Sequence, residues 1–229
     1  HLLQGSIAHK VFELYQAYQP NQLTDSEIDT IYEQALNDVA PFILQPQWRL
    51  ERVNLRQEIK QALTSFIDWL SKDDWRLEQV EQRLAGTLWG IPVKGFADAI
   101  LSRDQAVLIL DYKTSKSEAR FTQLDSGYDL QPYIYRQLLA QLSGNKNIIS
   151  GYYTLNDRTL VLDGVLGTQS KINMRVPAIT QHEQSREAVG VIQQRLKELR
   201  QGFIQLNKTT DEKHWKQFGI TFYGLENNV

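Results

Sequence analysis

The sequence contains no cysteine among its 229 residues. This absence excludes disulfide bonds, thiolate zinc sites, cysteine-ligated iron–sulfur clusters and a cysteine nucleophile. Any bound metal ion must therefore be held by oxygen and histidine ligands. The chain also lacks a glycine-rich GxxxxGK[ST] phosphate loop, so an ATP-driven motor of that class is not part of this sequence.

Long apolar runs and a large excess of one charge are missing as well. No run approaches the roughly 18 apolar residues of a membrane span, and no stretch is typical of a signal peptide. We therefore expect a cytoplasmic protein without a membrane partner. The formal net charge of -2 excludes a basic coat over the whole surface but is compatible with a local basic groove.

The first third of the chain has helical spacing of its apolar residues. Ile7, Val11, Leu14 and Tyr18 recur at intervals of three and four, which predicts an amphipathic helix. Two further helices are predicted over residues 25–43 and 55–75. Because the helical pattern begins at the first residues, which include no methionine, we expect the chain to be a fragment of a longer protein.

The pattern then changes to that of a sheet. Residues 77–114 are rich in Val, Ile, Leu and Trp and are interrupted by WGIP and SRDQ, which predicts a meander of three strands. After a polar loop we expect a helix over residues 128–144, a hairpin that turns at Asn156–Arg158, and a late helix over residues 183–203. The sequence thus predicts one α/β domain over residues 1–229. It comprises a helical lobe (1–75), a mixed-sheet core with a helix (76–165), and a C-terminal helix and tail (166–229).

Two opposite charges, Asp111 and Lys113, follow a strand that is apolar on both faces. Side chains alternate along a strand, so these two residues point to the same face. If the preceding turn is centred between Asp104 and Gln105, the residues that pair have numbers summing to 209, and Asp98 is then opposite Asp111. Facing carboxylates are destabilising unless a cation intervenes, and a hard divalent ion with oxygen ligands is the usual reason for such an arrangement. A solvated surface ion pair is the alternative interpretation.

Five motifs resemble those of the PD-(D/E)XK nuclease superfamily, in particular its RecB-like and AddB-like exonuclease domains. The motifs occur in the family's order, on elements of the expected type, within residues 5–140. They are GxxxH, VE, GxxD, DxKT and QxxxY, at Gly5–His9, Val80–Glu81, Gly95–Asp98, Asp111–Thr114 and Gln131–Tyr135. The resemblance implies a restriction-endonuclease-like core in which a central mixed sheet is flanked by helices.

The resemblance also implies roles for individual residues. His9, Asp98, Asp111 and the main-chain carbonyl of Tyr112 would bind Mg²⁺ or Mn²⁺, and Lys113 would be catalytic. Gln131 and Tyr135, four residues apart on one helix face, would contact DNA or Lys113. The alternative for Tyr135 is a core aromatic residue with a polar tip. Pro132 directly follows Gln131, and a residue before proline is biased away from helical dihedral angles, so we expect Gln131 at the helix cap.

Glu81 has two interpretations, as a residue that orients the lysine or the metal ligands and as a strand-edge residue beside Arg83. Many AddB-like domains carry an iron–sulfur cluster, whereas this chain has no cysteine to bind one. The resemblance as a whole implies a metal-dependent nuclease that acts on single-stranded DNA or DNA ends, and we expect phosphate contacts from Lys116, Arg120 and Arg136.

A helicase or repair subunit would lie on another chain or in the missing part of this one. The alternatives are a catalytically inactive DNA-binding or scaffold module and a hydrolase of another phosphate ester.

Overall fold

The computed structural model describes residues 2–18, 23–127, 129–143, 147–166, 172–177 and 181–203. By its internal contacts the chain divides into two compact units, residues 1–189 and 190–229. The first unit contains the sheet and the helices that cover it. Within the described residues, no helix has the length and apolar character that crossing a membrane requires.

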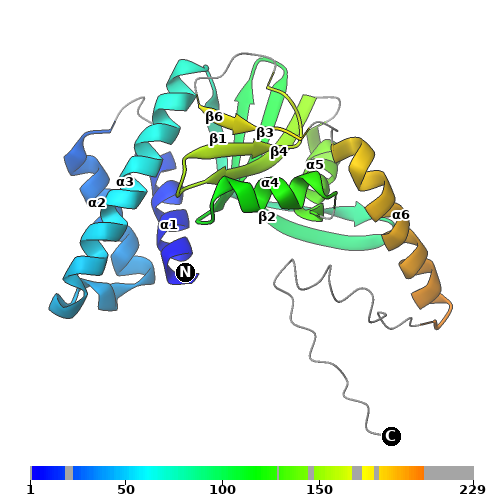
Figure 1. Cartoon of the computed structure of the whole chain (residues 1–229), viewed down its shortest axis with the longest axis horizontal. Coiled ribbons are helices and arrows are strands. Elements are labelled where there is room, and N and C mark those ends of the chain that lie inside the picture. Colours follow the sequence, from blue (N-terminus) through cyan, green and yellow to red (C-terminus); the bar gives the residue numbers. More distant parts are fainter. Residues whose placement is uncertain are drawn as a thin grey trace, which may run out of the picture. The chain divides into compact units, whose positions relative to one another are not determined.

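The N-terminal part of the first unit is a helical lobe. Its elements are α1 (Leu2–Tyr18), α2 (Asp25–Val39), two short 3-10 turns (Pro41–Leu44 and Pro46–Trp48) and α3 (Arg49–Lys72). Thr24 caps the start of α2 with a capping box. Its hydroxyl accepts a hydrogen bond from the N–H of Glu27, and the Glu27 carboxylate accepts one from the N–H of Thr24. Helix α3 begins six residues before the predicted start. Figure 1 shows the three helices together on one side of the sheet.

The sheet is mixed and has the strand order β1-β2-β3-β4-β5-β6. Strands β3 and β4 are parallel, as are β5 and β6, whereas the other neighbours are antiparallel. The predicted three-strand meander is present, and so is the hairpin predicted to turn at Asn156–Arg158, which lies between Thr154 at the end of β4 and Thr159 at the start of β5. The strands are β1 (Arg76–Leu88), β2 (Ile91–Arg103), β3 (Ala106–Lys113), β4 (Asn147–Thr154), β5 (Thr159–Leu162) and β6 (Asn173–Arg175).

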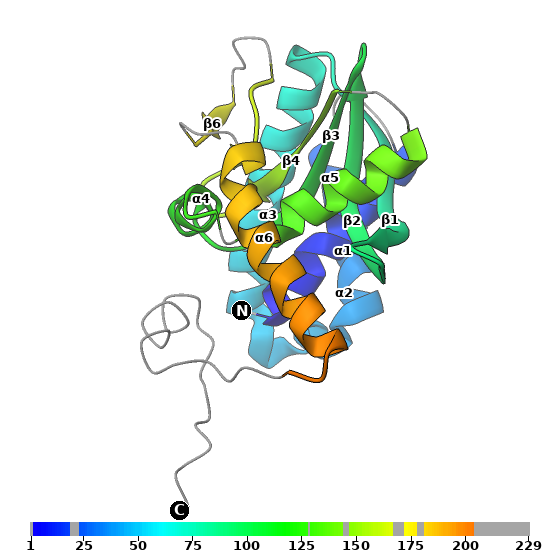
Figure 2. The same cartoon turned by 90° about the vertical axis from the view of Figure 1, so that its right-hand side faces the viewer.

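Strand β3 is buried on both faces, as its apolar run predicts. Leu108 and Leu110 belong to the core that contains α1, α2 and α3, whereas Val107 and Ile109 pack with helix α5 (Leu130–Ser143). Figure 2 shows α5 against the strands. This arrangement is the predicted α/β fold, and it places the end of β3 between α1 and α5.

One helix in the first unit was not predicted. Residues 117–125, within the expected polar loop, form helix α4 (Ser117–Asp125). Asp157, in the turn between β4 and β5, accepts hydrogen bonds from the N–H and the hydroxyl of Ser117 at 2.9 and 2.6 Å. The start of α4 is thus capped by a residue 40 positions away, so no local signal marks it. The late helix is present as α6 (Gln181–Arg200).

Candidate active site

The hairpin of β2 and β3 brings Asp98 and Asp111 to the end of their ladder. Ala99 pairs with Leu110, the register in which paired numbers sum to 209, as predicted. Asp98 and Asp111 are the next residues in that register, and both are buried. The Asp98 Oδ2 accepts the main-chain N–H of Tyr112 at 2.6 Å. The side chain of Asp98 therefore provides a hydrogen-bond acceptor where the backbone ladder has ended.

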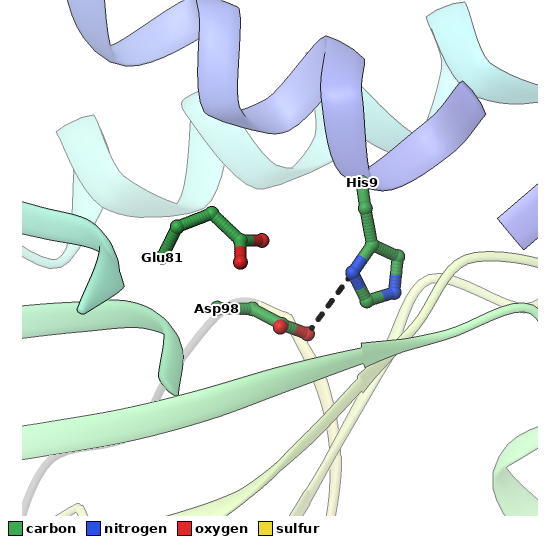
Figure 3. A group of neighbouring side chains, drawn as sticks. All are labelled: His9, Glu81 and Asp98. Atoms are coloured by element: carbon green, nitrogen blue, oxygen red, sulfur yellow. Dashed lines mark ion pairs between the residues drawn. The ribbon is translucent and has the colours of Figure 1, made fainter. Parts of the chain in front are cut away.

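His9 reaches this point from α1. Its Nδ1 lies 3.5 Å from Asp98 Oδ2, and its Nε2 lies 2.9 Å from the carbonyl oxygen of Tyr112. The helix holds its position through Ile7, Val11 and Phe12, which are fully buried in the core. Figure 3 shows the imidazole directed toward the strand that carries Asp98. The structure thus brings together His9, Asp98 and the carbonyl of Tyr112, three of the four residues predicted to bind metal.

Glu81 joins this group from β1. One potential ligand atom from each of His9, Glu81 and Asp98 can be chosen so that all three lie within 4.8 Å of one another. In the register of β1 and β2, Val80 pairs with Ala99 and Gln82 pairs with Ala97, so Glu81 falls opposite Asp98. Glu81 has a positive φ of 46°, an unusual conformation for a residue with a side chain. Figure 3 shows its carboxylate on the same side of the strands as His9.

Asp111, the fourth predicted ligand, is not in the three-residue group of His9, Glu81 and Asp98. Its Oδ2 forms an ion pair with Lys113, and its Oδ1 accepts a hydrogen bond from Gln131 Nε2 at 2.5 Å. The same Gln131 nitrogen lies 3.1 Å from the hydroxyl of Tyr135. Besides Asp98, four residues were predicted to be catalytic, and contacts join all four in one series: Lys113, Asp111, Gln131 and Tyr135.

Gln131 is not the cap residue that its neighbour Pro132 predicts. Helix α5 begins at Leu130, so Gln131 and Pro132 both lie in its first turn. Proline is tolerated there because the N–H groups of a first turn have no partner within the helix. The side chain of Gln131 thus leaves a helical backbone and points to the end of β3.

The acidic groups at the site carry mutual repulsion. Burial raises the pKa of Asp111 above its usual value, and the charge of Asp98 raises it further, against the opposing effects of Lys113 and His9. Burial and the charge of Asp98 also raise the pKa of Glu81. Burial lowers the pKa of His9, but the hydrogen bond and charge of Asp98 outweigh this effect and leave the pKa raised. The site therefore favours added positive charge.

Comparison with known proteins identifies the family of the chain. The model of the PD-(D/E)XK nuclease superfamily matches residues 1–212. The chain belongs to this superfamily. The match includes the whole sheet and every residue of the site described above, and it gives nuclease chemistry as the general class of activity.

Among solved structures, the chain is similar to a "putative exonuclease" from Eubacterium rectale. The two share 14% sequence identity with a TM-score of 0.44, over 86% of this chain and 71% of the other. No curated protein matches the sequence.

PD-(D/E)XK nucleases typically use divalent metal ions, and the residues of this chain fit such an ion. The site offers two carboxylates and an imidazole nitrogen within 4.8 Å of one another, and the Tyr112 carbonyl lies beside the imidazole. Oxygen ligands of this kind suit Mg²⁺ and Mn²⁺. The raised pKa values of Asp111 and Glu81 follow in part from like charges that a cation would offset.

The three cations expected to contact phosphate are in different environments. Lys116 is exposed. Arg120 donates to Ser115 and Gln123 and lies over the ring of Tyr152. Arg136 instead forms an ion pair with the buried Asp163 at 2.9 Å. Arg136 therefore joins α5 to the end of β5 and is not an open phosphate contact.

Proposed function

We propose that the protein is a metal-dependent deoxyribonuclease of the RecB/AddB-like type, which hydrolyses DNA phosphodiester bonds in repair or recombination. The observation that carries this proposal is the convergence of His9, Glu81 and Asp98 next to the Asp111–Lys113 ion pair. The order of the five sequence motifs supports the RecB/AddB-like assignment. Single strands or DNA ends would be the substrate, with a helicase or repair subunit as partner.

His9, Asp98, Asp111 and the carbonyl of Tyr112 would hold Mg²⁺ or Mn²⁺, with Glu81 as an additional ligand. The bound ion supplies charge neutralisation for the phosphate oxygens and lowers the pKa of water. The hydrogen bond from the Tyr112 N–H and the contact with His9 fix the carboxylate of Asp98. Because these contacts exist before substrate arrives, the ligand set is preorganised.

Lys113 would act on the reacting phosphate. Its ammonium group forms an ion pair with Asp111 and lies 5.7 Å from the centre of the Tyr152 ring, so it is confined to the edge of the site. From there it would orient the attacking water and offset the negative charge that develops in the transition state. Gln131 would hold Asp111 in position, and Tyr135 would hold Gln131 through the contact of its hydroxyl with the amide nitrogen.

The test is cleavage of end-labelled single- and double-stranded DNA in the presence of Mg²⁺, Mn²⁺ or EDTA. The wild type should cleave DNA with Mg²⁺ or Mn²⁺ and be inactive in EDTA. Lys113→Ala should lower kcat by roughly 10²- to 10³-fold while DNA binding changes little, because the lysine is proposed to act in the transition state. Its melting temperature should fall, because the buried Asp111 loses its counter-charge, and circular dichroism checks that the variant is folded.

Lys72→Ala is the matched control. Lys72 also forms an ion pair with an aspartate, Asp68, but it lies at the exposed end of α3. This variant should cleave DNA like the wild type. A wild type that binds DNA without cleaving it under any metal condition would instead support the inactive scaffold function.

A further inference from the structure

The outer half of the β1–β2 hairpin, residues 82–97, has one face covered by α5. A Cβ atom at Gly95 would lie 2.7 Å from the ring of Tyr135, so the backbone of β2 is in close contact with that helix. Leu84 and Leu88 of β1 pack in the same cluster as Leu138 of α5. This face is therefore part of the hydrophobic core.

The opposite face of the same hairpin carries exposed side chains. Lys94 and Phe96 are two residues apart in β2 and both are exposed, with 52% of Phe96 accessible. Arg83 of β1 is also exposed and pairs directly with Phe96 in the antiparallel register, so the two side chains share a face. We call Arg83, Lys94 and Phe96 the open hairpin face.

The charged groups and the ring of the open hairpin face have no partner in the described part of the chain. Within the described part of the chain, Arg83 and Lys94 form no hydrogen bond or ion pair through their side chains. Likewise, the ring of Phe96 has no aromatic or cationic partner among the described residues. An exposed phenyl ring beside two exposed cations is a surface that suits a ligand with both apolar and anionic parts, because an aromatic ring stacks on bases and cations attract phosphates.

The open hairpin face begins beside the metal ligands. Arg83 and Phe96 are each two residues from Glu81 and Asp98, which is about 7 Å along an extended strand, and Lys94 is two residues further, at about 13 Å. A chain-like polyanion bound at the acidic site would therefore continue over these cations. Arg83 and Lys94 are positively charged and would attract the negatively charged phosphates of such a ligand.

We propose that the open hairpin face binds a single strand of the DNA substrate, with an unpaired base stacked on Phe96 and phosphates bound by Arg83 and Lys94. This inference rests on the proposed nuclease function and names the form of its substrate. Stacking on an exposed ring requires a base that is free of its complement, so the face selects single strands over duplex DNA. The strand would reach Lys113 across Asp98.

The test is binding of a fluorescein-labelled oligothymidylate to the whole chain in EDTA, followed by anisotropy. Phe96→Ala should weaken binding by roughly 5- to 150-fold, the usual range for loss of one stacked base. It should not change binding of an abasic strand of the same length or of a duplex. Arg83→Gln and Lys94→Gln should each reduce the slope of log K against log salt concentration by about 0.7.

Matched controls separate local effects from general ones. Arg76→Gln removes an exposed cation from the other end of β1, and Phe42→Ala removes another exposed aromatic ring, 43% accessible, from the helical lobe. Both should leave affinity and salt slope at wild-type values. Melting temperatures of all five variants report whether each one is folded.

The possible outcomes separate this inference from the proposed function. If the wild type cleaves DNA while Phe96→Ala, Arg83→Gln and Lys94→Gln bind it like the wild type, the open hairpin face is not a binding surface and the nuclease function stands. If Phe96→Ala loses the same affinity for the abasic strand as for the thymidylate strand, Phe96 does not stack on a base. A wild type that neither binds nor cleaves DNA would contradict both proposals.

Discussion

Asp98 and Tyr112 are joined by a hydrogen bond in which the main-chain N–H of Tyr112 donates to the Asp98 carboxylate at 2.6 Å. The carbonyl of the same Tyr112 faces the imidazole of His9 at 2.9 Å. One residue of β3 thus fixes a side chain from β2 and another from α1. The ring of Tyr112 anchors this arrangement, because it is buried against Phe12 and Phe66.

Metal should stabilise the folded protein through its acidic ligands. In free Mn²⁺ at 100 times its dissociation constant, we expect the melting temperature to rise by roughly 5–10 °C over that in EDTA. Glu81→Gln should melt no lower than the wild type in EDTA, because it removes a carboxylate that faces Asp98, but its Mn²⁺-dependent rise should be smaller. Calorimetry or fluorescence melting measures both quantities.

Glu51→Gln is the control for this experiment, since it neutralises an exposed glutamate in the first turn of α3. It should keep the full metal-dependent rise. A Glu81→Gln protein with the wild-type response to Mn²⁺ would remove Glu81 from the ligand set, and a wild type that is indifferent to metal would favour the inactive scaffold.

The buried pair of Arg136 and Asp163 should be important for stability. Asp163 also accepts hydrogen bonds from the N–H and hydroxyl of Ser150, whose hydroxyl lies 2.8 Å from the carbonyl of Pro132 in α5. Asp163→Asn leaves the cation of Arg136 buried without a counter-charge, so we expect a loss of about 3 kcal/mol in the free energy of unfolding. Urea denaturation measures this loss.

Removing the cation as well should restore part of the stability. The double variant Arg136→Met with Asp163→Asn should be more stable than Asp163→Asn alone, because no unpaired charge remains in the core. If the double variant is less stable than the single one by the full cost of Arg136→Met, the two residues are not energetically coupled.

The cap of α4 should make stability depend on acid pH. Burial raises the pKa of Asp157, but the hydrogen bonds from Ser117 and Thr154 outweigh this effect and leave the pKa below its usual value. A lowered pKa in the folded state means that the ionised cap contributes stability above the unfolded pKa of about 3.9. This contribution is lost as the pH falls through the lowered value.

Asp157→Asn tests that contribution, because the amide has no charge and keeps only one of the two oxygens that accept from Ser117 and Thr154. At pH 7 the variant should be less stable than the wild type by about 1 kcal/mol, the difference between a charged and a neutral hydrogen bond. The gap should shrink between about pH 5 and pH 3. A gap that is constant over this range would show that the charge of Asp157 does not contribute.

The sequence predicted the register of the β2–β3 hairpin because its turn is local. Asp104, at a positive φ of 52°, lies at the centre of the turn that sets the pairing of Ala99 with Leu110. Counting from that turn placed Asp98 and Asp111 together. Register follows from turn geometry, so a local signal was enough to locate the core of the site.

The place of Glu81 was left open in the sequence analysis, although the turn of the β1–β2 hairpin is local too. Trp89 and Gly90, both at positive φ, set a register that pairs Leu88 with Ile91, and counting from it places Glu81 opposite Asp98. The sequence does not mark the left-handed backbone conformation of Glu81, because no glycine or asparagine stands there. Arg136 was predicted as a phosphate contact because its partner Asp163 lies 27 residues away on another element. Non-local contacts of this kind require the folded structure.

The most direct test of the proposed metal-dependent nuclease is single-turnover cleavage of end-labelled single-stranded DNA by the wild type and by Asp98→Asn across a series of Mn²⁺ concentrations. Wild-type cleavage should rise with Mn²⁺, saturate and disappear in EDTA. Asp98→Asn removes the charge that faces His9 and Glu81, so it should need more Mn²⁺ and remain roughly 100-fold or more slower at saturation. Cleavage that persists in EDTA, or an Asp98→Asn protein with the wild-type rate at every Mn²⁺ concentration, would contradict it.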